Sequence, residues 1–377
     1  MHAIAMFGWA VSALALAGAC YNAVAAAFVS RFAPAAPRPA AFPAVTILKP
    51  LHGEEPGLED DLATFCAQDY PAPVQIVFGV QDAADPAIGA VERLRARFAA
   101  LDIALVCDAR RHGANAKISN LVNMRPRAKH GVLVVSDSDI AAPPDYLRTV
   151  MAALQQPGAG AVSCFYSGLP TAGLGSLLCA MGIDYQFLPN ALTGVALGLA
   201  EPCFGSTIAL RGAVLDEIGG FQAFADFLAD DYEIGRALRA RGYHIALPAM
   251  LVRHACGEKS LADWLAHELR WARTIRIVAP AGHIGSIVTH AIPLALIGAI
   301  LCGFTVFALS VLATTLAARA MLKWRIDRLT GAASGPIWLL PVRDVLSFGV
   351  FAASLFGGRV EWRGERLRVG RHGEILR

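Results

Sequence analysis

The sequence has few charged residues and no paired-cysteine pattern, and each absence argues against a class of protein. Only 17% of its 377 residues are Asp, Glu, Lys or Arg, and the formal net charge is +3. No long Lys/Arg tract and no basic stripe interleaved with aromatic residues is present, so we expect no nucleic-acid partner. The eight cysteines are scattered without a C-x-x-C pair. This spacing argues against a disulfide framework or a zinc site and indicates mostly buried thiols in a reducing compartment.

The apolar residues that make up 55% of the chain are concentrated towards its two ends. Residues 3–30 contain no charged side chain and exceed the ~20 residues that cross a bilayer. No Lys or Arg precedes this run, which favours an uncleaved anchor over a signal peptide. Arg31 and Arg38 follow it, so the positive-inside rule predicts that the next domain lies in the cytosol.

Two further stretches have the character of membrane segments. Residues 285–318 contain no Asp, Glu, Lys or Arg and are longer than one span, and Gly298 and Gly303 could mark a turn between two helices. Basic residues on both sides favour such a hairpin. Residues 336–358 carry Arg343 and Asp344 near their start, which indicates a weaker span or a re-entrant segment. We therefore expect a multi-pass protein with three or four membrane elements.

The polar middle of the chain alternates between strand and helix patterns, which predicts a mostly parallel sheet in an open α/β domain. Strands are expected at residues 45–48, 74–80, 103–106 and 132–135, and helices at residues 58–68, 86–98 and 115–124. The predicted segments are an anchor (1–31), a linker (32–43), a catalytic domain (44–260), an interfacial helix (261–284), membrane segments (285–358) and a cytosolic basic tail (359–377).

Carboxylates follow two of these strands and open a later helix. Asp82 closes the apolar run 74–81, Asp137 and Asp139 follow Val132–Val135, and Asp231 stands at the start of a helical pattern. Ligands of open α/β sheets bind at the carboxyl ends of the strands, so these groups should converge. Asp137 and Asp139 could hold Mg²⁺ or Mn²⁺ together with diphosphate oxygens. The alternative for this Asp-Ser-Asp triplet is an ordinary turn.

The other acidic residues have both a chemical and a structural interpretation. Asp231 could take a proton from an acceptor hydroxyl, or it could favour the helix N-terminus electrostatically. Asp230 is expected to be the helix cap or to support Asp231. Asp82 could contact a base or ribose, whereas Asp85, before Pro86, is expected to cap the next helix.

A helical segment ahead of the second apolar region brings Trp264, His267, Arg270 and Trp271 onto neighbouring faces. Arg binds phosphate oxygens in a fork, and Trp offers a flat apolar surface. Near a membrane the same residues also serve as interfacial anchors.

Two residues outside this segment have open roles. Lys117 could reach a diphosphate or lie at the surface. Cys203 could line a site or fill the core.

These residues resemble a known family. Asp82, Asp137-Ser138-Asp139, Asp231 and Arg270-Trp271 are similar to the D, D, D, (Q/R)xxRW signature of glycosyltransferases with a GT-A fold, and most closely to the ceramide glucosyltransferase branch. The resemblance runs from about residue 45 to the C-terminus. It is carried further by residues 45–51, by Val80-Gln81-Asp82 with Asp85-Pro86, and by Lys117-Ile118-Ser119-Asn120-Leu121, Gly205-Ser206-Thr207 and Asp231-Tyr232.

Within that branch, residues 48–53 and 267–274 look most like the bacterial hopanoid-associated glycosyltransferase. The resemblance implies transfer of N-acetylglucosamine from its UDP-sugar to a membrane lipid such as bacteriohopanetetrol, at the bacterial inner membrane. His267 departs from the usual Gln or Arg. Asp139 departs from the glycine of animal ceramide enzymes, which leaves open which carboxylate of the pair carries the metal.

Transferred to this chain, the family motif assigns a role to each matching residue. Asp231 would be the catalytic base of an inverting reaction. Donor and diphosphate contacts would come from Asp82, Lys117, Asp137, Arg270 and Trp271, and acceptor contacts from His267 and Cys203. Asp137 and Asp139 would bind the divalent cation. The alternatives are a ceramide glucosyltransferase using UDP-glucose and a membrane protein that binds nucleotide sugars without turnover.

Overall fold

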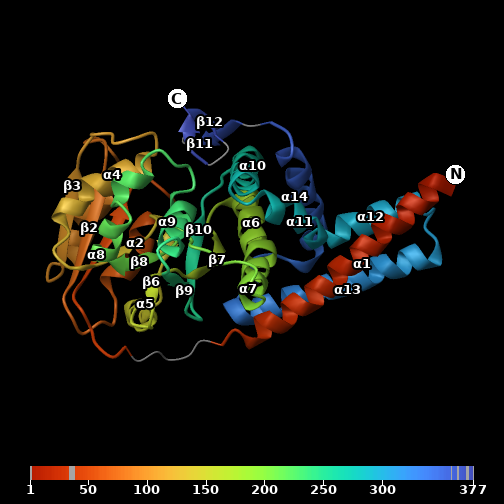
Figure 1. Ribbon diagram of the computed structural model, residues 1–377, viewed down its shortest axis with the longest axis horizontal. Coiled ribbons are helices and arrows are strands. Elements are labelled where there is room, and N and C mark those ends of the chain that lie inside the picture. Colours follow the sequence, from red (N-terminus) through yellow and green to blue (C-terminus); the bar gives the residue numbers. More distant parts are fainter. Residues whose placement is uncertain (1, 34–38, 358, 363–364, 371–372, 377) are drawn as a thin grey trace. The chain divides into compact units, whose positions relative to one another are not determined.

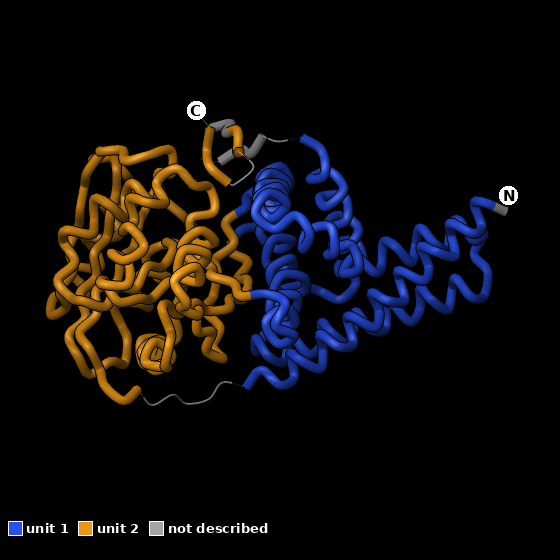
Figure 2. Tube along the Cα trace, viewed as in Figure 1, with its two compact units in different colours: residues 1–33, 172–200, 258–367 blue, residues 34–171, 201–257, 368–377 orange. Residues whose placement is uncertain are grey.

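The computed structural model describes residues 2–33, 39–357, 359–362, 365–370 and 373–376, and Figure 1 labels its helices and strands. The chain forms two compact units (Figure 2). Unit 1 comprises residues 1–33, 172–200 and 258–367, and unit 2 comprises residues 34–171, 201–257 and 368–377. The units therefore do not follow the predicted segments throughout. Residues 172–200 group with the membrane helices, and residues 368–377 group with the α/β unit. The predicted linker, 32–43, lies partly outside the described residues.

Unit 2 is built on a seven-stranded sheet with the order β3-β2-β1-β4-β8-β6-β9. Its strands are β1 (Val45–Pro50), β2 (Val74–Val80), β3 (Asp102–Cys107), β4 (Val132–Val135), β6 (Ala159–Val162), β8 (Ile208–Arg211) and β9 (His244–Ala246). β1 lies between β2 and β4, and β2 between β1 and β3, and all these pairs are parallel. β8 runs antiparallel to both β4 and β6. The predicted mostly parallel sheet is confirmed.

The parallel strands form because their sequences are continuous apolar runs. Every residue of β1 is buried, as are all but the first residue of β2 and of β4. Such strands are covered by structure on both faces. A smaller sheet of unit 2 has the order β5-β10-β7, with β5 at Ile140–Ala141, β7 at Phe165–Pro170 and β10 at Leu251–Cys256.

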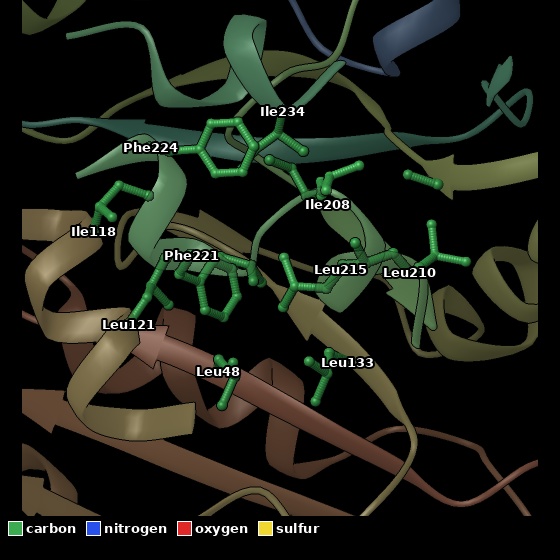
Figure 3. Packing of buried hydrophobic residues seen from close by; sticks show 14 of the residues in the cluster. Leu48, Ile118, Leu121, Leu133, Ile208, Leu210, Leu215, Phe221, Phe224 and Ile234 are labelled. Atoms are coloured by element: carbon green, nitrogen blue, oxygen red, sulfur yellow. The ribbon is translucent and has the colours of Figure 1, made fainter. Parts of the chain in front are cut away.

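The helices of unit 2 cover its sheets and complete its core. They are α2 (Leu58–Cys66), α3 (Ala87–Arg97), α4 (Ala116–Met124), α5 (Tyr146–Leu154), α8 (Gly212–Glu217) and α9 (Asp230–Arg239), with short 3-10 turns at η1 (Arg125–Arg127) and η3 (Phe221–Phe224). In Figure 3, Leu48 and Leu133 of the sheet face the cluster that contains Leu121 of α4 and Phe221 of η3. This core holds α4 and the start of α9 beside the sheet, and both carry predicted site residues.

Unit 1 is helical. Its helices are α1 (His2–Arg31), α6 (Gly173–Gly182), the π-helix η2 (Ile183–Phe187), α7 (Leu188–Ala196), α10 (Leu261–Val278), α11 (Pro280–Gly285), η4 (Ser286–Thr289), α12 (Ala291–Leu301), α13 (Val306–Thr330), η5 (Ile337–Leu339) and α14 (Leu340–Ser354). α1 packs against α7, α12 and α13. The tyrosine Oη of Tyr21 donates to Asn190 Oδ1 over 2.9 Å and ties α1 to α7.

Small residues allow the apolar helices to approach closely, as is usual for helix pairs in membranes. A Cβ on Gly298 of α12 would lie 2.4 Å from Ser12 Oγ of α1. Gly298 is therefore a packing residue inside a helix, and the predicted turn forms at Gly303 and Phe304, whose φ angles are 62° and 56°. The predicted hairpin of two helices is thus α12 followed by α13, although α13 continues to Thr330.

Three helices among the described residues are long and apolar enough to cross a membrane, namely Ala3–Arg31, Val306–Thr330 and Ile337–Ser354. A fourth candidate is the pair Pro280–Thr289 and Ala291–Leu301, which is bent by 62°. This agrees with the three or four membrane elements expected from the sequence.

The C-terminal segment of unit 2 returns to the loop that precedes α9. Within unit 2, Arg368 and Val369 of β12 (Glu365–Val369) pair with β13 (Ile375–Leu376). The amide of Ile375 donates to the carbonyl oxygen of Asp226 over 2.7 Å, and the amide of Leu228 donates to that of Gly373 over 3.0 Å. In unit 1, a short strand β11 (Arg359–Trp362) follows α14.

Candidate active site

The carboxyl ends of β1, β2 and β4 lie at one edge of the large sheet. The register pairs Pro50 with Gly79 and Leu48 with Val135. Asp82 follows β2, and Asp137 and Asp139 follow β4, so all three residues leave the sheet at this edge. The meeting of Asp82 with the other carboxylates stays a prediction.

Lys117, Asp137 and Asp231 come together around one glycine. Lys117 Nζ lies 2.6 Å from Asp137 Oδ1 and 3.4 Å from Asp230 Oδ2. The amide of Gly205 donates to Asp231 Oδ2 over 2.9 Å. A Cβ at residue 205 would lie 2.9 Å from Asp137 Oδ2 and 3.5 Å from Asp231 Oδ2. Only glycine leaves room for both carboxylates at this point.

The local sequence explains how these side chains are placed. Asn115 caps α4 by accepting from the amide of Ile118 over 3.0 Å, which puts Lys117 in the first turn. The same asparagine donates to the carbonyl oxygen of Phe227 over 2.8 Å and to Asp230 Oδ1 over 3.3 Å. The start of α4 and the start of α9 are therefore fastened together. Asp230 contacts Asn115 and Lys117, which agrees with the prediction that it supports Asp231.

Asp231 has the environment of a proton acceptor. Burial, followed by the neighbouring charge of Asp230, raises the pKa of the Asp231 carboxyl to about 6, against the opposing effect of Lys117. A base with a pKa in this range is ionised at neutral pH and still accepts a proton readily.

Asp139 faces two residues that sequence reasoning missed. Its Oδ2 lies 3.3 Å from His254 Nε2 of β10. Its Oδ1 is buried and has no hydrogen-bond partner in the described part of the chain. The charge of Asp139 also affects Glu55: burial, followed by that charge, raises the pKa of the Glu55 carboxyl to about 7. His254 gave no signal in the sequence, since it lies in a short strand far along the chain, whereas Glu55 stands just after β1.

The residues present fit a divalent cation. Asp137 and Asp139 leave the same turn, and carboxylate oxygens are the ligands that Mg²⁺ and Mn²⁺ prefer. The buried, unpartnered Asp139 Oδ1 is an oxygen that a cation would satisfy. His254 Nε2 adds a nitrogen beside it.

Lys49, at the end of β1, holds the turn that carries these carboxylates. Its Nζ donates to the carbonyl oxygen of Asp137 over 2.6 Å, to Ser136 Oγ over 3.2 Å and to the carbonyl oxygen of Ile140 over 3.3 Å. It also lies 3.6 Å from the centre of the Phe65 ring. The Lys49 side chain is fully buried, so all of its hydrogen-bonding capacity goes to this turn.

The functional roles of Asp82 and Cys203 stay predictions, because neither residue forms a hydrogen bond or ion pair with the cluster around Gly205, within the residues that the structure describes. Asp82 is exposed, and its Oδ1 accepts from the amide of Ala84 over 2.9 Å. Asp85 accepts from the amides of Ala87 and Gly53 and so caps α3, as expected. Cys203 lies in the hydrophobic core, where burial raises its thiol pKa. This placement matches the core interpretation, and acceptor contact by Cys203 stays a prediction. All eight cysteines are free thiols, but only four of them are buried, so the expectation of mostly buried thiols holds for half of them.

In unit 1, α10 carries His267, Arg270 and Trp271. The helix begins with a capping box between Ser260 and Asp263. The rings of His267 and Trp271 meet edge to face with centres 4.5 Å apart. His267 Nδ1 pairs with Glu258. Burial lowers the pKa of His267, but hydrogen bonds with Cys179 and Glu258 outweigh this and raise it to about 8.

His267 stands where the glycosyltransferase signature has Gln or Arg, and it is paired with Glu258. At neutral pH, Glu258 keeps a donor on each ring nitrogen of His267. Glu258 lies just before α10 and outside its helical pattern. Its pairing with His267 depends on the turn that leads into the helix, which the sequence did not predict.

Comparison with known proteins agrees with this geometry. The model of the family described as glycosyl transferase family 21 matches residues 10–375. The chain belongs to this family. Among curated relatives, ceramide glucosyltransferase 3 of Caenorhabditis elegans is 25% identical over 61% of this chain and 50% of its own length. Ceramide glucosyltransferase of Candida albicans is 30% identical over 29% of this chain and 22% of its own length. The chain thus spans about half the length of the first of these relatives, and less of the second.

A solved structure supports the fold of this family 21 chain. A mannosyltransferase from Pyrobaculum calidifontis, in complex with GDP-Man and Mn²⁺, has a TM-score of 0.50 and 23% identity over 92% of this chain and 99% of its own. This likeness shows the predicted fold class, a GT-A type α/β fold.

Proposed function

We propose that this protein is an inverting, cation-dependent glycosyltransferase that moves a sugar from a UDP-sugar to a hydroxyl group of a membrane lipid. The observation that carries the proposal is the meeting of Lys117, Asp137 and Asp231 around Gly205. A pure binding protein has no need of a carboxylate whose pKa is raised to about 6. The apolar helices of unit 1 favour an acceptor that resides in a membrane.

The proposed reaction is one displacement at the anomeric carbon. The acceptor oxygen forms the new bond to that carbon while the bond to the UDP oxygen breaks, and Asp231 takes the hydroxyl proton. Lys117 and Arg270 offer positive charge to the diphosphate, Trp271 a flat contact surface, and Asp82 an acceptor for the ribose or uracil. Asp137 and Asp139, with His254, would hold Mg²⁺ or Mn²⁺, which neutralises charge on the leaving diphosphate.

The proposed substrates are UDP-N-acetylglucosamine and a polyhydroxylated hopanoid such as bacteriohopanetetrol. The support is the similarity of residues 48–53 and 267–274 to the hopanoid-associated branch. His267 is proposed as an acceptor contact. The proposed location is the bacterial inner membrane, as the resemblance implies. Unit 2 is proposed to lie in the cytosol, because the apolar helix α1 ends in the basic residue Arg31.

A second candidate is ceramide glucosylation with UDP-glucose, which the names of the curated relatives favour. The two are separated by offering the purified protein both donors with both lipids in mixed micelles and identifying products by mass. Hexose on ceramide as the main product would replace the hopanoid proposal.

Replacing the base tests the proposed function directly. Asp231→Asn keeps the size of the side chain but cannot accept the proton, so kcat for lipid glycosylation should fall about 10²- to 10⁴-fold. The KM for the UDP-sugar should change little, because the donor is held by other groups. The measurement is product formation with saturating Mn²⁺ in detergent.

The matched control is Asp216→Asn, an exposed aspartate of α8 whose side chain is 68% accessible. It should leave kcat unchanged. Near-full transfer by Asp231→Asn would show that Asp231 is not the base. Donor binding by the wild type without product from any lipid would favour the non-catalytic alternative.

A further inference from the structure

One arginine of unit 1 contacts the helix that carries Arg270 and Trp271 at two points. Arg343 of α14 is 2% exposed. Its Nη2 donates to Glu268 Oε1 over 2.6 Å, and its guanidinium lies 5.4 Å from the centre of the Trp264 ring. Its Nε donates to the carbonyl oxygen of Leu178 in α6 over 2.8 Å. A single side chain therefore joins α6, α10 and α14.

The surrounding chain is shaped to admit this pair. A Cβ on Gly182, the last residue of α6, would lie 2.0 Å from Arg343 Nη2 and 2.8 Å from Glu268 Oε1. Any other residue at this position would push the pair apart. The glycine indicates that the contact of Arg343 with Glu268 is a built feature of the packing.

A buried ion pair is a poor device for stability alone. Removing both charges from water offsets most of their attraction, and apolar residues of similar volume often serve as well or better. The best-attested use of such groups is to fix one arrangement among several packed alternatives. A role in fixing the orientation of α10 therefore accounts for this pair better than a role in stability.

The contacts of Arg343 fix the rotation of α10 about its own axis. Trp264 and Glu268 are four residues apart and so lie one above the other on the helix. Each residue of a helix is turned by about 100° from the last. Once Trp264 and Glu268 are held against Arg343, the directions of Arg270 and Trp271 are set as well.

We infer that Arg343 is a positioning residue that holds α10 in the rotation at which Arg270 and Trp271 act. The inference rests on the proposed function for the consequence in catalysis, but the orientation of α10 can be measured without it. Arg343 itself contacts no reacting group. Its effect on the reaction passes through α10.

The chain provides a matched control on the adjacent residue. Asp344 of α14 is also buried, and it pairs with Arg319 of α13, whose Nε and Nη2 lie 2.7 Å from its two carboxylate oxygens. Arg319 also donates to the carbonyl oxygen of Tyr185 in η2. This second pair has the same chemistry and similar burial, but it joins α14 to α13 and η2 and not to α10.

The test compares two double variants of the full chain in detergent. Arg343→Met with Glu268→Leu replaces the first pair by apolar side chains, and Arg319→Met with Asp344→Leu replaces the second. Each is measured for kcat and KM with UDP-sugar and lipid, for melting temperature, and for amide hydrogen exchange over α10. A third variant, Arg343→Lys, keeps the charge but loses the planar fork that reaches two helices.

The first double variant should lower kcat roughly 10- to 100-fold and speed exchange in α10, while its melting temperature stays near that of the wild type. The second should keep both kcat and the exchange of α10. Arg343→Lys should fall between the wild type and the first double variant in kcat.

The inference is overturned if the first double variant keeps wild-type exchange in α10, or if the two double variants lose α10 protection equally. Absence of sugar transfer in the wild type would instead count against the proposed function. The exchange comparison would still decide the role of Arg343.

Discussion

At the scale of residues, the site depends on a few carboxylates whose surroundings differ. Burial and the charge of Asp230 raise the pKa of the Asp231 carboxyl to about 6, whereas the Asp137 carboxylate is paired with Lys117. Two neighbouring carboxyls with different surroundings can divide the work, one accepting a proton and one binding a cation.

The pH dependence of the reaction follows from the Asp231 carboxyl. The base works only as the carboxylate, and its pKa of about 6 means that protonation begins as the pH falls towards 6. We expect kcat to be level between pH 7 and 8 and to fall about tenfold per pH unit below about pH 6. The measurement is kcat at saturating substrates across pH 5–8, and a level rate down to pH 5 would contradict it.

Which of these residues can be read from the sequence depends on whether they mark a strand end. Asp137 and Asp139 follow an apolar run, so their placement at the sheet edge was predictable. His254 lies more than a hundred residues after Asp139 in the sequence, and the fold brings the two together. Glu258 contacts His267 only because the chain turns just before α10. Their side chains carry no local pattern, and physical reasoning along the chain could not single them out.

At the scale of elements, the turn after β4 depends on a lysine from another strand. Lys49→Met would leave the carbonyl oxygens of Asp137 and Ile140 without their donor. Because supporting contacts of this kind typically affect metal affinity 10- to 100-fold, the Mn²⁺ concentration for half-maximal activity should rise by about that factor. The measurement is a Mn²⁺ titration of initial rates.

Lys129→Met is the control for this change, since the Lys129 side chain is 61% exposed and pairs with Asp102 at the surface. It should leave the Mn²⁺ titration unchanged. An equal shift in both variants, or none in Lys49→Met, would show that Lys49 does not position the turn.

The elements themselves were predictable to different degrees. The first four strands of the large sheet and the helices between them were predicted within a few residues, because continuous apolar runs separated by amphipathic stretches specify them. β5 and β9 are only two and three residues long, too short for a pattern to show. β6 has the same length as β4, but its sequence is Ala-Gly-Ala-Val and lacks the large apolar residues that mark β4. The apolar run of α6, η2 and α7 went unrecognised, because nothing in its own sequence says that its partners are α1, α10 and α14.

At the scale of the whole molecule, the end of the chain supports the loop before Asp231. Phe227 and Glu374 form an antiparallel bridge, and Ile375 is 6% exposed. Ile375→Asp would bring an unpaired charge into this buried position and detach the segment. We expect kcat to fall several-fold, since the loop from Asp226 to Leu228 loses two backbone hydrogen bonds.

Leu376→Asp provides the comparison, because the neighbouring Leu376 is 50% exposed. It should behave as the wild type in kcat and in melting temperature. If Ile375→Asp also behaved as the wild type, the C-terminal segment would have no part in placing Asp231.

The interleaving of the two units has a consequence for biosynthesis. α6 and α7 leave the ribosome between the two main stretches of the α/β unit, while α10 and α14, on which α6 packs, are still untranslated. This apolar stretch must wait in a partly assembled state until the last helices emerge. A truncated expression fragment that ended at residue 257 would keep α6 without those partners, and we expect it to aggregate.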